Sequence, residues 1–172
     1  MNSSNVKSRF NRFSDHTIFS GLLILFTFFQ ISAAYAQVPV ELNKFLSSPE
    51  SKTLGMDRSY LLGNHTIAYL SSASVNFSKE ELPTKLDVRD GGFGRISEVK
   101  SILGDVEILQ IIVSDEGEKR QVIPTSVIEQ IPSLRVVIIL SEVPISAQEV
   151  QGLTVNFQGS SVKILYLFSQ PA

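Results

Sequence analysis

Three apolar runs in the second half of the chain constrain its fold more than any other feature. Each run is short, rich in β-branched residues and bounded by turn-forming residues, which is the pattern of a β-strand. The runs are Val106–Val113, Leu134–Leu140 and Val162–Phe168. Because they are apolar almost throughout and do not alternate with polar residues, we expect both faces of these strands to be covered, as in a parallel sheet. Two further runs, Thr66–Leu70 and Lys85–Val88, also predict strands.

Short helix-compatible segments lie between the last four predicted strands, and each carries an apolar stripe at helical spacing. The stripes are Ile96, Val99 and Leu103; Val127, Ile128 and Ile131; and Ala147, Val150 and Leu153. A further short helix is expected at Glu41–Leu46. Strand–helix–strand units of this kind cross over with right-handed chirality. The sequence therefore predicts an α/β fold of short parallel strands alternating with short helices. A second interpretation pairs Leu153–Phe157 with Val162–Phe168 as a C-terminal hairpin.

The predicted strands recur at a regular spacing. Their paired apolar positions, separated by steps of 23, 28 and 28 residues, are Leu86/Val88, Leu109/Ile111, Val137/Ile139 and Leu165/Leu167. The last three extend upstream to an LxxLxL pattern that begins at Val106, Leu134 and Val162. Over about residues 84–168 this pattern resembles the leucine-rich repeat, which implies one strand and one short helix per unit. At the family's asparagine position this chain has Ser114, Glu142 and Gln170. A repeat-like stack and a compact open α/β sheet both remain open.

The first 36 residues have the order of parts of a secretory signal peptide. Three basic residues precede the apolar run Ile18–Ile31, and Ala34-Tyr35-Ala36 offers small residues at the two positions that a signal peptidase reads. We therefore expect cleavage after Ala36 and export to the periplasm, the cell envelope or the medium. The alternative is an uncleaved anchor over Ile18–Ala36, which is just long enough to span a bilayer. Contact with a membrane is expected only through such an uncleaved segment.

Composition narrows the class of protein further. The expected organisation is a signal peptide at 1–36, an N-terminal helix and loop segment at 37–63, and an α/β, repeat-like domain at 64–172. Residues 37–172 keep twelve of the fifteen basic and sixteen of the seventeen acidic residues, which leaves a net charge of −4. This charge and the lack of a clustered basic stretch argue against nucleic acid as a partner. The chain has no cysteine, which is typical of an exported bacterial protein and excludes thiolate metal ligands and a cysteine nucleophile.

The stretch Arg89–Arg95, "RDGGFGR", sits between a predicted strand and a predicted helix. A dinucleotide site would use such glycines to hold a pyrophosphate, with Asp115 closing the next strand. The third glycine of that fingerprint is replaced by Ser97, and the nearby carboxylates Asp87 and Asp90 would repel phosphates. We therefore expect a tight corner, in which Gly91 and Gly92 supply a left-handed turn and Ser97 is available as a helix cap.

Catalytic and metal-binding patterns are weak. His65 is the only histidine after residue 36, and no GxSxG pattern accompanies the serines near it. The acidic group Asp115, Glu116 and Glu118 lacks the ligand spacing of a calcium loop. We predict no catalytic residue, no metal and no cofactor. A hydrolase-like site near His65 or near Asp87 and Asp90 is the alternative.

The apolar strands themselves suggest a function. In a repeat-like stack, five C-terminal side chains would lie on the open concave face, and in a compact sheet the same side chains would be core. They are Ile112, Ile138, Leu140, Tyr166 and Phe168. The expected function is an exported, non-enzymatic protein-interaction domain that binds a partner protein or a second copy of itself through these strands. The further alternative is a small-ligand binding module at the Gly91–Gly94 corner.

Overall fold

The computed structural model describes residues 37–78 and 80–169, which fall within one compact unit, Ala36–Ala172. The predicted signal peptide and the cleavage position Ala36 lie outside the described residues. Residues 37–63, the expected helix and loop segment, belong to the same unit as the sheet. Their first strand pairs with the last strand of the chain, and their helices supply one of its two cores.

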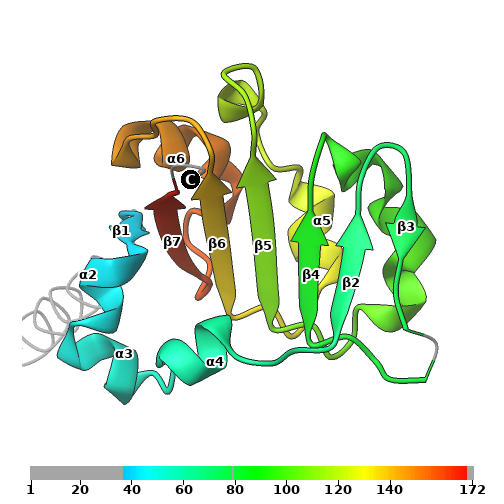
Figure 1. Cartoon of the computed structure of the whole chain (residues 1–172), viewed down its shortest axis with the longest axis horizontal. Helices are drawn as coiled ribbons and strands as arrows, with labels where there is room; N and C mark the ends of the chain where they lie inside the picture. The colour runs from blue at the N-terminus through cyan, green and yellow to red at the C-terminus, as the bar shows by residue number, and fades with distance from the viewer. Residues whose placement is uncertain (1–36, 79, 170–172) are drawn as a thin grey trace, which may run out of the picture. The chain divides into compact units, whose positions relative to one another are not determined.

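A seven-stranded open sheet forms the centre of the domain, in the order β1-β7-β6-β5-β4-β2-β3 (Figure 1). The strands are β1 (Val40–Glu41), β2 (Ile67–Leu70), β3 (Val75–Asn76), β4 (Lys85–Val88), β5 (Ile108–Val113), β6 (Val136–Ser141) and β7 (Lys163–Phe168). All neighbours are parallel except β2 and β3, which form an antiparallel hairpin. The α/β class and the five predicted strands are confirmed. The two-residue strands β1 and β3 were not predicted.

One face of the sheet, which we call the crossover face, carries the helices that connect β4, β5, β6 and β7 (Figure 1). They are η1 (Gly92–Ile102) and two short 3-10 turns, η2 (Glu118–Arg120) and η3 (Val155–Phe157), with α5 (Thr125–Gln130) and α6 (Ala147–Leu153). The predicted stripe Ile96, Val99 and Leu103 is buried here, although η1 is a 3-10 helix. Helix α6 begins with a capping box between Ser146 and Glu149. The C-terminal hairpin is wrong, because β7 pairs in parallel with β6.

The opposite face, which we call the N-terminal face, is only partly covered. Three short helices, α2 (Leu42–Leu46), α3 (Pro49–Thr53) and α4 (Arg58–Leu62), lie towards the β1–β7 side and the lower end of the sheet (Figure 1). Leu42, Phe45 and Leu61 pack with Ile138 and Leu165 in a second core. Figure 1 shows none of these helices in front of β2 or β4. Polar side chains of β4 and β5 occupy the part of the face that this second core leaves.

The strand register distinguishes the two architectures that the sequence left open. Leu86 lies beside Leu109, and Leu109 beside Val137, as the repeat pattern predicts. Val137 then lies beside Ile164, so the last step is one residue shorter than the LxxLxL pattern implies. Neighbouring residues of a strand point to opposite faces, so Leu165 points away from the crossover face and joins the second core. The fold is a compact open α/β sheet with helices on both faces.

Candidate functional site

The carboxyl ends of β2 and β4 enclose a crevice, and beyond these ends the two strands continue in different directions. β2 turns outward into the edge strand β3, whereas β4 continues through η1 towards β5. The crevice lies outside the carboxyl ends of two parallel strands, which is the side of an open α/β sheet on which ligands bind. The crevice has a volume of about 230 Å³. It is lined by Tyr69, Leu70, Ser71, Ser74, Asp87, Arg89 and Asp90, and we call it the β2–β4 crevice.

The glycine corner, Arg89–Gly92, borders this crevice through Arg89 and Asp90. Asp90 and Gly91 both have left-handed backbone conformations, with φ values of 48° and 68°, and the N–H of Gly92 donates to the carbonyl of Arg89 at 2.9 Å. An Asp-Gly pair suits such a turn, because these residues tolerate positive φ. The expected corner is confirmed at Gly91, but Asp90 takes the other left-handed position in place of Gly92. Gly92 is needed for space, since a Cβ there would lie 2.6 Å from the carbonyl oxygen of Leu70.

Two other residues of the predicted corner have different roles from those expected. Ser97 lies inside η1 and caps no helix; the residue before η1 is Gly91, which provides no side-chain cap. Asp115 accepts hydrogen bonds from the backbone N–H groups of Gly117 and Glu118, at 2.7 and 2.9 Å. It therefore closes its own loop and does not face the corner's helix as a ribose-binding carboxylate would.

A buried polar network lies below the crevice on the N-terminal face. The Nζ of Lys85 donates to the Oε1 of Gln110 at 2.8 Å, and the Nε2 of Gln110 donates to the Oδ2 of Asp87 at 3.2 Å. The three residues are 8%, 7% and 5% exposed in the order Lys85, Gln110, Asp87. The remaining oxygen, Oδ1 of Asp87, lies 3.6 Å from Lys85 Nζ and accepts no hydrogen bond from the described residues. Burial raises the pKa of Asp87, and the charge of Lys85 opposes that shift.

The strand register explains how Asp87 is buried without a helix over it. Tyr69 on β2 and Gln110 on β5 are its direct lateral partners. Lys85 and Arg89 lie two positions away along the chain, on the same face of β4. The short carboxylate therefore sits between four longer side chains. Its opening is the β2–β4 crevice, which both Asp87 and Tyr69 line.

A second, wider hollow of about 550 Å³ lies at the amino ends of the strands and contains His65. The ring nitrogens of His65 lie 2.6 Å from the carbonyl oxygen of Tyr60 and 3.2 Å from Thr84 Oγ1. The hydroxyl of Tyr60 donates to Glu107 at 2.7 Å, and Arg135 lies 3.5 Å from the same carboxylate. Burial and the bond to Glu107 raise the pKa of Tyr60 to about 12. These contacts tie α4 to the sheet, and His65 hydrogen-bonds with neither Asp87 nor Asp90.

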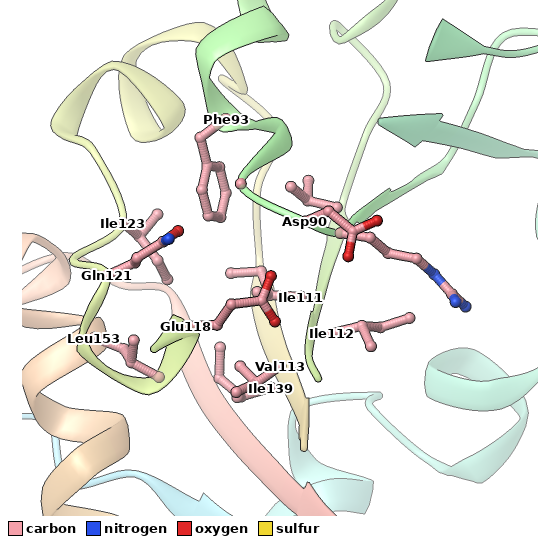
Figure 2. A pocket seen from close by; sticks show the side chains of 13 residues that line it. Asp90, Phe93, Ile111, Ile112, Val113, Glu118, Gln121, Ile123, Ile139 and Leu153 are labelled. Carbon is pink, nitrogen blue, oxygen red and sulfur yellow. The ribbon is translucent and has the colours of Figure 1, made fainter. Parts of the chain in front are cut away.

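A third cavity, shown in Figure 2, lies on the crossover face at the carboxyl ends of β4 and β5. Figure 2 shows the side chain of Glu118 among the apolar side chains of Ile111, Val113, Ile139 and Leu153. The cavity measures about 20 Å³. This is room for about one water-sized molecule. It is too small to be a ligand site.

The side chains predicted as an interaction surface do not form one. Ile112 and Ile138 are buried, with 7% and 0% of their surface exposed, so the expectation that they are accessible is wrong. Leu140 packs against the second core and Tyr166 against the first, on opposite faces of the sheet. Phe168 is exposed. Helices α2–α4 cover Ile138 and Leu140, and of these helices only α2 was predicted, as Glu41–Leu46.

Sequence reasoning missed Tyr69, Lys85 and Gln110 as site residues. A signal for Lys85 and Gln110 exists, because polar residues interrupt otherwise apolar strands at Lys85, Asp87 and Gln110.

Within the described residues no group of three His, Cys, Asp or Glu side chains is placed to hold a metal ion. Among the same residues, no helix is long and apolar enough to cross a membrane. No family model, curated protein or solved structure matches this chain.

Proposed function

We propose that residues 37–172 form a non-enzymatic binding domain that takes a small polar ligand in the β2–β4 crevice. The observation that carries this proposal is the carboxylate of Asp87, which lines the crevice and whose buried Oδ1 has only the ammonium group of Lys85 near it, at 3.6 Å, and receives no hydrogen bond from the described residues. Leaving a buried polar group unsatisfied costs about 1–3 kcal/mol. The ion pair with Lys85 offsets part of that cost, and a ligand that donates a hydrogen bond to the Asp87 carboxylate offsets more of it, which favours binding.

The charges around the crevice indicate a ligand without net charge. Asp87 and Asp90 are balanced by Lys85 and Arg89, all four within or next to β4. A site built to hold an anion or a cation would carry an excess of the opposite charge. Export of the domain is part of the proposal and rests on the signal-peptide pattern of residues 1–36.

Two other functions receive less support from the geometry. The protein-interaction function expected from the apolar strands needs Ile112 and Ile138 at the surface, and both are buried. A hydrolase-like site would need a base close to a nucleophile. His65 instead has its two ring nitrogens beside Tyr60 and Thr84, at the other end of the sheet from Asp90.

Nuclear magnetic resonance on ¹⁵N-labelled residues 37–172 tests the proposal, since this segment contains all seven strands and both cores. The probes are glycine, L-serine, ethanolamine, glycerol, D-glucose, N-acetylglucosamine and inorganic phosphate, each at up to about 10 mM, which detects dissociation constants in the millimolar range. We expect saturable shifts of the amides of Tyr69–Ser74 and Asp87–Asp90.

Two variants locate the binding. Asp87→Ala removes the carboxylate that lines the crevice, and Asp105→Ala removes a carboxylate that lines the hollow at the opposite end of the sheet. Binding should be lost in the first variant and kept in the second. Shifts confined to the region of His65, or no shift with any probe, would overturn the proposal. The wild-type shift map decides the question even where Asp87→Ala does not fold.

A further inference from the structure

The side chain of Tyr69 forms a half-exposed aromatic wall of the β2–β4 crevice. It is 46% exposed, on a strand whose neighbouring positions Ala68 and Leu70 are fully buried. Its register partner on β4 is Asp87, so the ring stands beside a carboxylate that also lines the crevice. An exposed aromatic face next to a hydrogen-bonding group suits a ligand with one apolar side and several polar groups.

The polar groups of the crevice suit a ligand rich in hydroxyls. The carboxylate of Asp87 accepts hydrogen bonds, and the guanidinium of Arg89 only donates them. The hydroxyls of Ser71 and Ser74 lie 3.1 Å apart, and Ser71 Oγ also accepts from the Ser74 N–H at 3.0 Å. A hydroxyl of a ligand can donate to Asp87 and accept from Arg89, because each hydroxyl has both capacities.

The position of Lys85 argues against a cationic ligand at Asp87. Its ammonium group lies 3.6 Å from Asp87 Oδ1, so a ligand ammonium bound at that oxygen would approach a like charge. Two like charges at such a distance in a partly desolvated site repel each other strongly. A neutral hydroxyl donor avoids this repulsion.

Size limits the ligand to one ring. Pockets for drug-sized molecules measure roughly 300–1,000 Å³, and the β2–β4 crevice measures about 230 Å³. We infer that the ligand of this site is a neutral saccharide, with one sugar ring stacked on Tyr69 and its hydroxyls bonded to Asp87 and Arg89. This inference rests on the proposed binding function and names its ligand class.

The test compares methyl α-D-glucopyranoside, D-galactose and N-acetylglucosamine with ethanolamine and L-serine on residues 37–172. The resonances of the Tyr69 ring report stacking directly. Tyr69→Phe keeps the ring face and should bind a saccharide as the wild type does. Tyr69→Ala removes the face and should weaken binding about tenfold or more. Phe77→Ala is the matched control, because Phe77 is an exposed aromatic residue that does not line the crevice.

Each outcome decides between the two proposals. Binding of a saccharide that depends on the Tyr69 ring supports the inference. Binding of ethanolamine or L-serine without any saccharide overturns the inference and leaves the proposed function standing. Equal saccharide binding by wild type and Tyr69→Ala refutes the stacked geometry. Absence of binding by every probe overturns the proposed function together with the inference.

Discussion

Substitution of Gly92 by alanine provides a sharp test of how the crevice is built. A Cβ at this position would lie 2.6 Å from the carbonyl oxygen of Leu70 and 2.9 Å from both its carbonyl carbon and the Cα of Ser71. All three atoms belong to the backbone of β2 and the residue after it, so no side chain can rotate away to make room. The end of β2 must therefore move away from η1. Overpacking of this kind lowers the free energy of unfolding by about 1–3 kcal/mol.

The expected loss for Gly92→Ala is therefore about 1–3 kcal/mol in the free energy of unfolding. For a domain of this size, 1 kcal/mol corresponds to about 3–5 °C in melting temperature. Urea denaturation of residues 37–172, followed by circular dichroism, measures the change as a lower midpoint at constant slope. Because Leu70 and Ser71 line the β2–β4 crevice, ligand binding should weaken as well.

Gly94→Ala is the matched control for this substitution. Gly94 lies two residues further along η1, and a Cβ there would meet no atom within 4 Å. The free energy of unfolding of Gly94→Ala should stay within about 0.5 kcal/mol of that of the wild type. If Gly92→Ala is as stable as Gly94→Ala, the close approach of η1 to the end of β2 does not require glycine at position 92.

Two further predictions concern the faces of the sheet. Ile138→Lys places a charge in the second core and should cost at least about 3 kcal/mol, whereas Phe168→Lys should be tolerated, and thermal melting compares them. Equal melting temperatures would contradict the burial of Ile138. Burial raises the pKa of Asp87 above its ordinary 3.8. The stability of the wild type relative to Asp87→Asn should therefore fall as the pH rises from 3.8 through the folded pKa. Urea titrations at several pH values measure this difference in stability, and a difference that stays flat or rises would contradict the prediction.

The five long strands were predictable because each combines β-branched residues with turn formers at its ends. β1 and β3 were not, since two residues provide no pattern of their own, and these strands exist through their neighbours β7 and β2. The register of β7 was also beyond the sequence. Its run Lys163–Phe168 has apolar residues on both faces, so Ile164 and Leu165 are equally suitable partners for β6 by composition.

The candidate site was only partly accessible from sequence. The glycine corner was predicted, as a turn, from its Asp-Gly-Gly composition. The pairing of Tyr69 with Asp87 and of Asp87 with Gln110 depends on which strands are neighbours and in which register. The decisive property of the N-terminal face is that the covering helices stop short of β4, and helix length alone does not predict where three short helices will lie.

The pairing of β1 with β7 has a consequence for the order in which the chain folds. Val40 and Leu165 are neighbours in the sheet, yet nearly the whole described chain separates them. The loop that their contact closes is among the longest in the domain, and such contacts carry the greatest loss of chain entropy. The second core joins Leu42 and Phe45 to Leu165 and shares this delay. A nascent chain that has not yet produced β7 therefore presents the apolar side chains of α2 without their final partner. During synthesis, this is the interval in which these apolar side chains are available to a chaperone.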